Sequence, residues 1–249
     1  MSDKVMIVTG GSRGIGAATA RLGAAQGYAV CVNYQSNGAA AERLVAEIAK
    51  QGGRAIAVQA DVSREAQVEA LFKQADEALG PVTALVNNAG ITGHVGRLDA
   101  VDGETLRSVV EINVLGLMYC ARAAVQRMSP RHGGRGGAIV NVSSGAATLG
   151  SPGVYVWYAA SKGAADSFTI GLGRELARDG IRVNAVAPGF VDTDIHAASG
   201  MPNRMADEAP STPIGRAATP DEIAEPILWL LSDEASYVTG EILRVAGGR

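Results

Sequence analysis

The sequence has few aromatic residues, few cysteines and no excess of positive charge. Phe, Trp and Tyr make up 4% of its 249 residues, and the formal net charge is −3. A surface that binds nucleic acid would carry a basic patch, which this balance argues against. The 2 cysteines, Cys31 and Cys120, lie in apolar stretches without metal-ligand spacing. We therefore expect two buried free thiols, no metal site and no nucleic-acid partner.

Long hydrophobic runs are also absent. No apolar run approaches the roughly 20 residues that span a bilayer. The apolar stretch near the N-terminus is short and interrupted by glycine, unlike a secretory signal. Hydrophobic residues nevertheless make up 47% of the chain, which is enough for a large core. We therefore expect a cytoplasmic protein that does not bind membranes.

Short runs rich in β-branched residues alternate with longer amphipathic ones. This pattern predicts strands at 5–10, 28–34, 55–61, 84–90, 138–142, 181–189 and 241–248, and helices at 14–27, 39–53, 64–79, 104–128, 158–177 and 221–232. Such alternation is typical of a parallel sheet covered on both faces. We predict an α/β fold in which residues 1–249 form a single domain, a Rossmann-type, doubly wound sheet of seven parallel strands with helices on both faces.

One segment, residues 190–219, breaks this rhythm. It is rich in Pro, Gly, Ser and Met. A long loop inside a compact domain is usually functional. We predict that it is a substrate loop that closes over the site.

A glycine-rich turn, TGGSRGIG at 9–16, follows the first predicted strand and opens the first predicted helix. Gly10, Gly14 and Gly16 allow a tight turn and close approach of a phosphate. The free N–H groups and the dipole of the helix attract a pyrophosphate. An ordinary strand-to-helix turn is the alternative, but the place of the motif in a strand–turn–helix unit favours a dinucleotide site.

The end of the second predicted strand indicates which dinucleotide binds. A site for NAD places Asp or Glu there, about 20 residues after the turn, to hold a ribose hydroxyl. This chain has NYQSN at 33–37, with no carboxylate. Arg13 could pair with a 2′-phosphate, and Ser36 and Asn37 could donate hydrogen bonds. We predict that NADP(H) is preferred, with NAD(H) as the alternative if Arg13 is only a solvated turn residue.

Three motifs in order carry a resemblance to a known family: TGGSRGIG, NNAG at 87–90 and YAASK at 158–162. Together they resemble the single-domain branch of the short-chain dehydrogenase/reductase family. The likeness covers essentially the whole chain, and is strongest to bacterial oxidoreductases related to glucose 1-dehydrogenases and 3-oxoacyl thioester reductases. The resemblance implies hydride transfer between NADP(H) and a small carbonyl or alcohol substrate. It also implies a homotetramer.

The resemblance implies four catalytic residues. Tyr158 would be the general acid and base, and Lys162 shares its helix face at i+4. A nearby ammonium would lower the pKa of a phenol from about 10 toward neutral pH. Ser144, with Ser143 as the alternative, would hydrogen-bond the substrate oxygen. Asn113 would hold a water that links Lys162 to solvent.

The glycine turn and the resemblance together predict the cofactor site. Asp61 would contact the adenine, Pro188 and Gly189 the nicotinamide, and Thr193 its carboxamide. The full predicted set is Gly10, Ser12, Arg13, Gly14, Ile15, Gly16, Asn33, Ser36, Asn37, Asp61, Val62, Asn88, Ala89, Gly90, Tyr158, Lys162, Pro188, Gly189, Val191 and Thr193.

Other interpretations remain for the same motifs. A Tyr and a Lys four residues apart more often mark a solvated helix face, and only the co-occurrence of all the motifs favours catalysis. An NADP(H)-binding redox sensor without turnover is the main alternative, and an isomerase or dehydratase on the same fold is another. The expected substrate pocket, at 91–95, 151–157 and 190–219, shows no cluster of Arg or Lys that would demand a phosphate or carboxylate, and Arg204 is the lone candidate for binding one.

Overall fold

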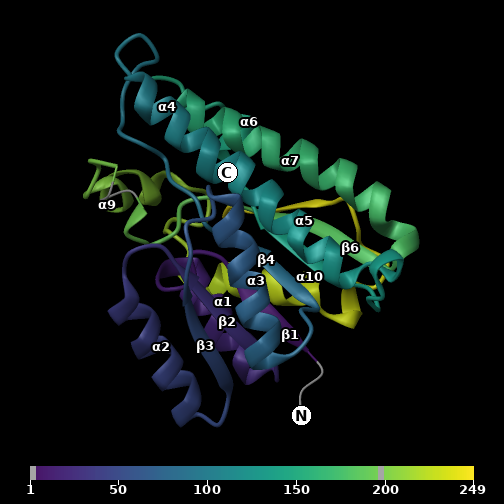
Figure 1. Cartoon of the computed structure of the whole chain (residues 1–249). Coiled ribbons are helices and arrows are strands. Elements are labelled where there is room, and N and C mark those ends of the chain that lie inside the picture. The colour runs from purple at the N-terminus through teal and green to yellow at the C-terminus, as the bar shows by residue number, and fades with distance from the viewer. Residues whose placement is uncertain (1–3, 196–198) are drawn as a thin grey trace.

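Seven parallel strands form one sheet in the computed structural model, which describes residues 4–195 and 199–249 (Figure 1). The strands are β1 (Val5–Val8), β2 (Ala29–Tyr34), β3 (Arg54–Gln59), β4 (Ala84–Asn87), β5 (Gly137–Val142), β6 (Ile181–Pro188) and β7 (Ile242–Val245). Their order across the sheet is β3-β2-β1-β4-β5-β6-β7, and every neighbouring pair is parallel. The predicted doubly wound sheet of seven strands is confirmed.

Helices connect the strands and cover the sheet. They are α1 (Gly14–Ala25), α2 (Gly38–Lys50), α3 (Glu65–Leu79), α4 (Gly103–Val110), the π-helical turn η1 (Glu111–Gly116), α5 (Leu117–Met128), α6 (Ala146–Leu149), α7 (Val156–Leu176), α9 (Arg204–Glu208) and α10 (Pro220–Leu231). Short 3-10 turns are η2 (Pro130–His132), η3 (Ala177–Asp179), η4 (Ala209–Ser211) and η5 (Asp233–Ala235).

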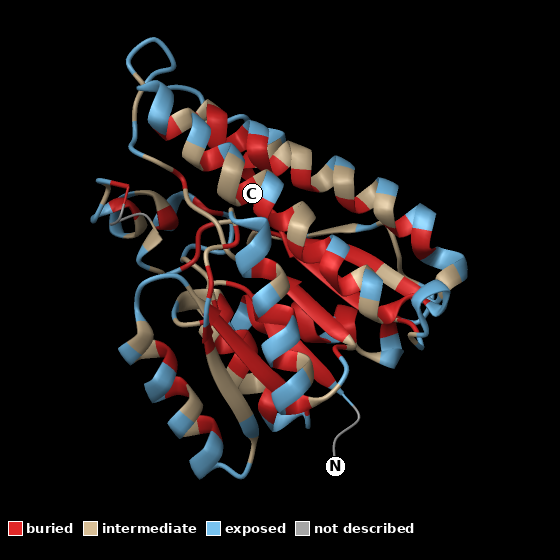
Figure 2. Ribbon diagram, viewed as in Figure 1, coloured by how far each residue is buried: buried red, intermediate tan, exposed pale blue. Residues whose placement is uncertain are grey.

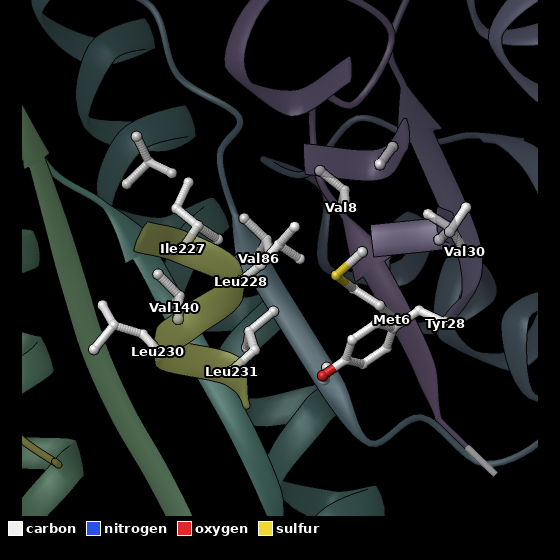
Figure 3. Packing of buried hydrophobic residues seen from close by; sticks show 14 of the residues in the cluster. Met6, Val8, Tyr28, Val30, Val86, Val140, Ile227, Leu228, Leu230 and Leu231 are labelled. Carbon is white, nitrogen blue, oxygen red and sulfur yellow. The ribbon is translucent and has the colours of Figure 1, made fainter. Parts of the chain in front are cut away.

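Alternate residues of the central strands face opposite helix layers. Met6 and Val8 of β1 belong to a buried cluster with residues of α1, α2 and α10, and Figure 3 shows Leu228 of α10 in this layer. Val5 and Ile7 belong to a second cluster, with residues of α3, α5 and α7. Both clusters are closed to solvent, and Figure 2 shows buried strands between helices that are exposed on their outer faces. This double burial explains why the strands read as continuous apolar runs.

The helix predicted at 104–128 is not a uniform α-helix. It consists of α4, the π-helical turn η1 and α5, and Asn113 lies within η1. The Asn113 side chain makes two hydrogen bonds with the backbone of Ile91, in the loop that follows β4. These bonds stabilise the wider turn locally, and such turns occur frequently at functional sites.

The segment Gly103–Met128 is long and apolar enough to cross a membrane by length and composition, with a mean hydropathy of 1.4 in its most apolar window. In this fold α5 instead packs against β4 and α3. Its residues Cys120, Ala123 and Ala124 are fully buried. Burial in this fold thus accounts for part of the apolar composition of the segment, of whose most apolar window 44% is buried.

The segment at 190–219 is more ordered than a single long loop. It contains α9 and η4, and Val191 pairs with Ala218 in a parallel bridge. Residues 196–198 of this predicted substrate loop lie outside the described part of the chain.

Both cysteines are free and buried, as predicted. Burial raises the pKa of the Cys31 and Cys120 thiols to about 12. Neither thiol is therefore ionised near neutral pH, and neither is suited to act as a nucleophile. Within the described ranges, no group of three or more His, Cys, Asp or Glu side chains is arranged to hold a metal ion.

Candidate active site

A cleft of about 420 Å³ opens at the carboxyl ends of the strands. Residues that follow each of the seven strands line it, and the strand order reverses between β1 and β4. Parallel α/β sheets bind ligands at such a switch point. All the residues predicted to bind the cofactor line this cleft except Gly16. Three of the four predicted catalytic residues line it as well, whereas Asn113 is buried beside it.

The glycine turn is shaped by three residues that cannot carry a side chain there. Gly10 and Gly14 have φ angles of +59° and +52°, in the left-handed region that favours glycine. A Cβ atom at Gly16 would lie 2.5 Å from the carbonyl oxygen of Gly10. Arg13, the N-cap residue of α1, makes no side-chain cap bond, so the first N–H groups of the helix stay open to an anion. The turn therefore fits a pyrophosphate group.

Two asparagines hold this turn in place. The Asn33 side chain accepts a hydrogen bond from the Gly10 N–H at 3.2 Å and donates to the carbonyl oxygen of Ala60 at 3.0 Å. The Asn88 amide donates to the carbonyl oxygens of Thr9 at 2.9 Å and Gly10 at 3.0 Å. Both side chains thus form hydrogen bonds with the backbone, and they would affect a bound cofactor by fixing the shape of the turn.

The end of the cleft predicted to hold the adenosine has Arg13 and Ser36 exposed on its wall. Asn37 also lines it, but its side-chain oxygen caps α2 by accepting from the Ala40 N–H at 3.1 Å. One carboxylate oxygen of Asp61 accepts two bonds, from the N–H and the hydroxyl of Ser63. No carboxylate follows β2 at 33–37.

The end of the cleft predicted to hold the nicotinamide is lined by residues that follow β6. Pro188 accepts a hydrogen bond from the Gly145 N–H at 2.8 Å, and the Gly189 N–H donates to Val245 at 3.0 Å. The Thr193 methyl would lie 3.1 Å from a Cβ atom at Gly14, so this segment approaches the glycine turn. The two ends of the cleft are therefore joined across its floor.

Tyr158 and Lys162 project into the cleft from the first turns of α7. Both side chains are nearly buried, with the residues 8% and 5% exposed. The Lys162 ammonium donates to the Val142 carbonyl oxygen at 2.7 Å and lies 5.7 Å from the centroid of the Tyr158 ring. The two groups predicted to work together are thus neighbours at the end of β5.

The two candidate serines differ in their partners. Ser144 lies beside the Tyr158 phenol, whose pKa it lowers, and the Ser144 hydroxyl accepts from the Ala146 N–H at 3.1 Å. Ser143 is buried, and its hydroxyl instead donates to the Lys162 carbonyl oxygen at 3.5 Å. Contact with the phenol favours Ser144 over Ser143 as the residue that meets the substrate oxygen.

Asn113 is buried beside the cleft and forms hydrogen bonds with residues that position the site. Its Oδ1 accepts from the Ile91 N–H at 2.9 Å, and its amide donates to the Ile91 carbonyl at 2.8 Å and to the Ser161 hydroxyl at 3.0 Å. A Cβ atom at Gly90 would lie 3.3 Å from Asn113 Oδ1 and 3.5 Å from Lys162 Nζ. Both amide hydrogens are committed to protein partners, which leaves only Oδ1 for a further hydrogen bond.

The pKa of Tyr158 departs from the expectation. Burial raises it to about 12, although Ser144 lowers it. Burial also lowers the pKa of Lys162 to about 8, against the opposing effect of Asp166. The expected lowering of the phenol pKa by Lys162 is therefore not met, because desolvation of the phenol dominates. The phenol holds its proton, which is the form that donates to a carbonyl oxygen.

The expectation of a lone cation in the substrate pocket is wrong. Arg204, Arg244 and Arg249 all line the cleft, together with Tyr155 and Phe190. Arg204 is buried and its guanidinium is hydrogen-bonded to the Tyr155 hydroxyl. Residues that follow the strands of a parallel sheet line the same crevice. Because Arg249 directly follows the last predicted strand, the sequence could have predicted that it lines the cleft.

Comparisons with known proteins agree with this geometry. The family profile described as enoyl-(acyl carrier protein) reductase matches residues 10–249. The chain is 51% identical to the oxidoreductase YgfF of Escherichia coli (strain K12), over 98% of this chain and 99% of the relative. It is 39% identical to a 3-oxoacyl acyl-carrier-protein reductase of Synechocystis sp. (strain PCC 6803), over 100% and 97%. A short-chain dehydrogenase from Burkholderia cenocepacia J2315, solved in complex with NADP, superposes with a TM-score of 0.90 at 36% identity, over 98% and 97%.

Proposed function

The chain belongs to the short-chain dehydrogenase/reductase family, whose activity is on alcohol and carbonyl groups, and we propose that it uses NADP(H), with Tyr158 as the general acid and base. The observation that carries this proposal is that Ser144 and Lys162 both lie beside Tyr158 in the cleft: Ser144 lowers the pKa of the phenol, and the Lys162 ammonium lies 5.7 Å from the centroid of its ring. The hydroxyls of Ser144 and Tyr158 can bind one substrate oxygen from two sides.

The bound nicotinamide supplies or accepts the hydride. In carbonyl reduction, Ser144 and Tyr158 donate hydrogen bonds to the carbonyl oxygen and orient it. As that oxygen gains negative charge, Tyr158 transfers its proton to it and becomes a phenolate. The Lys162 ammonium stabilises this phenolate, and the proton is later replaced from solvent. Oxidation of the alcohol runs through the same steps in reverse.

Residues at both ends of the cleft support the proposal that the cofactor is NADP(H). The glycine turn and the open N-terminus of α1 fit the pyrophosphate, and the Lys162 ammonium lies where the nicotinamide end begins. The absence of a carboxylate at 33–37 removes repulsion against a 2′-phosphate, and Arg13 supplies a positive charge. The relative from Burkholderia cenocepacia binds NADP, which supports this choice.

The preference is tested by measuring Kd for NADPH and NADH by fluorescence titration. We expect NADPH to bind at least about tenfold more tightly, and Arg13→Gln to weaken NADPH binding while leaving NADH binding nearly unchanged. Arg43→Gln, an exposed change on α2 outside the cleft, is the control. Equal affinities in the unaltered protein would contradict the proposal.

The catalytic role is tested with Tyr158→Phe. NADPH consumption is followed by absorbance against ketones, aldehydes, sugars, keto-esters and quinones. We expect kcat to fall at least about 100-fold while NADPH binding persists, because the variant lacks only the proton donor. Tyr119→Phe, on α5 outside the cleft, is the matched control. Near-normal turnover by Tyr158→Phe would remove Tyr158 from the mechanism, and binding without any turnover would favour the redox-sensor alternative.

We also propose a homotetramer located in the cytoplasm. Val110 and Leu115, on the α4–η1 surface, are exposed large hydrophobic residues. On α7, nothing lies within 4 Å of a Cβ atom placed at Gly163, so a second helix could approach closely. Light scattering that gives the mass of a single chain would contradict the tetramer.

A further inference from the structure

The cleft is positively charged although the chain is not. The formal net charge of the chain is −3. The lining of the cleft nevertheless contains five basic side chains and two acidic ones. These are Arg13, Lys162, Arg204, Arg244 and Arg249, against Asp61 and Asp194. Arg13 lies in the glycine turn and Lys162 beside Tyr158, so three arginines remain to be explained.

Two of these arginines converge on one aromatic ring. The Arg204 guanidinium lies 5.4 Å from the centroid of the Phe190 ring, and the Arg249 guanidinium lies 4.0 Å from it. Arg204 also lies 5.1 Å from the centroid of the Tyr155 ring. The third, Arg244 of β7, donates to the Thr148 hydroxyl at 3.2 Å. Three separate segments of the chain thus bring guanidinium groups to the lining of one cleft.

This part of the cleft adjoins the reacting end. The rings of Tyr155 and Tyr158 pack edge to face with centroids 5.1 Å apart. The positive charge of Arg204 lowers the pKa of both phenols against the effect of burial, and that of Arg249 lowers the pKa of Tyr155. Arg204 and Arg249 are therefore within electrostatic reach of the residues around the proposed proton donor.

The three arginines differ in burial and in whether the protein supplies an ion-pair partner for the guanidinium. Arg204 is 8% exposed and pairs with Glu208 at 3.1 Å, so it is a structural part of the wall. Arg244 and Arg249 are exposed, and neither has an ion-pair partner among residues 4–195 and 199–249. Each can therefore bind an anion without first breaking an ion pair.

We propose that the substrate carries an anionic group, a carboxylate or a phosphate, which Arg249 and Arg244 bind while the carbonyl lies at Ser144 and Tyr158. The guanidinium fork matches both oxyanions in geometry, and charge-assisted hydrogen bonds are the strong ones. Arg204 positions the Phe190 and Tyr155 rings against which the substrate packs. This inference rests on the proposed reductase activity and narrows its substrate class.

The test compares pairs of carbonyl compounds that differ only in charge. The carboxylate pair is 4-oxopentanoate and its methyl ester, and the phosphate pair is dihydroxyacetone phosphate and dihydroxyacetone. We expect kcat/KM with NADPH to favour the charged member of one pair by about tenfold or more. We expect Arg249→Gln and Arg244→Gln each to reduce this ratio several-fold, and Arg43→Gln to leave it unchanged. The pair that shows the effect identifies the oxyanion.

Three outcomes would overturn the inference. One is an equal kcat/KM for the charged and neutral members of both pairs. Another is a ratio of charged to neutral kcat/KM that stays unchanged in both Arg249→Gln and Arg244→Gln. The last is an NADPH Kd that weakens about tenfold in Arg249→Gln with the ratio unaltered, which would assign the arginine to the cofactor. Turnover of neutral carbonyls that depends on Tyr158 would uphold the reductase even if the inference failed. If no compound is turned over, calorimetry on the NADP+-saturated protein gives a Kd for each member of each pair. The ratio of the Kd values for the charged and neutral members then tests the inference without turnover.

Discussion

Replacing Gly16 with alanine tests whether the glycine turn is the feature that holds the cofactor cleft in shape. The added methyl would lie 2.5 Å from the Gly10 carbonyl oxygen and 2.6 Å from the Asn88 amide nitrogen, whereas ordinary contact begins at 3.4 Å. The Gly10 carbonyl must therefore move by close to an ångström, and the Asn88 amide must release its two hydrogen bonds to Thr9 and Gly10.

The energetic effect follows from these contacts. Losing two hydrogen bonds costs about 1 kcal/mol each, and overpacking costs about 1–3 kcal/mol. The higher helix propensity of alanine returns about 1 kcal/mol. A net destabilisation of about 2–4 kcal/mol lowers Tm by roughly 2–4 °C per kcal/mol in a chain of this size. The displaced N–H groups of the turn should weaken NADPH binding by about tenfold or more.

The assay is thermal unfolding combined with NADPH titration, and Gly171→Ala is the matched control. Gly171 lies inside α7 with nothing within 4 Å of a Cβ atom, so alanine there should raise stability by up to about 1 kcal/mol. The two substitutions add the same methyl and are expected to move Tm in opposite directions. A Gly16→Ala protein with Tm within about 1 °C and NADPH affinity within about twofold of the unaltered protein would refute the reasoning.

Two further predictions concern the groups behind the reacting end. Because burial lowers the pKa of Lys162 to about 8, its ammonium is lost as pH rises through that value, so kcat/KM for carbonyl reduction should fall above about pH 8. A Lys162→Arg variant that keeps the same inflection would contradict this origin. Asn113→Ala strands the N–H and carbonyl of Ile91 and should lower stability by about 1–3 kcal/mol, together with kcat. Ser161→Ala removes only one of the Asn113 bonds and should cost less in both unfolding and turnover, and the reverse order would refute the supporting role.

The sheet was predictable from sequence largely because its inner strands are buried on both faces. Burial makes strands such as Val5–Val8 and Ile181–Pro188 read as apolar runs, and the helices between them carry their own amphipathic pattern. The ends were less predictable. The strand expected to reach residue 90 ends at Asn87, because the backbone N–H groups of Asn88 and Ala89 donate to the Thr9 hydroxyl and not to a neighbouring strand.

The site was predictable where spacing fixes geometry, and not where tertiary packing does. Tyr158 and Lys162 are one helical turn apart, so their proximity follows from the sequence. The dominance of burial over charge in the pKa of Tyr158 depends on neighbours from other elements, which no local pattern reports. Likewise, Arg204 and Arg249 both contact the Phe190 ring although they are far apart in the sequence, so no local pattern could have predicted that they meet.

The π-helical turn η1 also fixes the rotational phase between α4 and α5. Each residue of an α-helix advances the chain by about 100° around the axis. A π-helical turn holds about one residue more than an α-helical turn. Winding all of Glu111–Gly116 as α-helix would therefore rotate α5, with its buried Cys120 and Ala124, by about 100° relative to Val109 of α4. The wide turn keeps the buried faces of the two helices in phase despite the extra residue, and a segment exchanged with a relative that has one residue fewer here would need a uniform α-helix in its place.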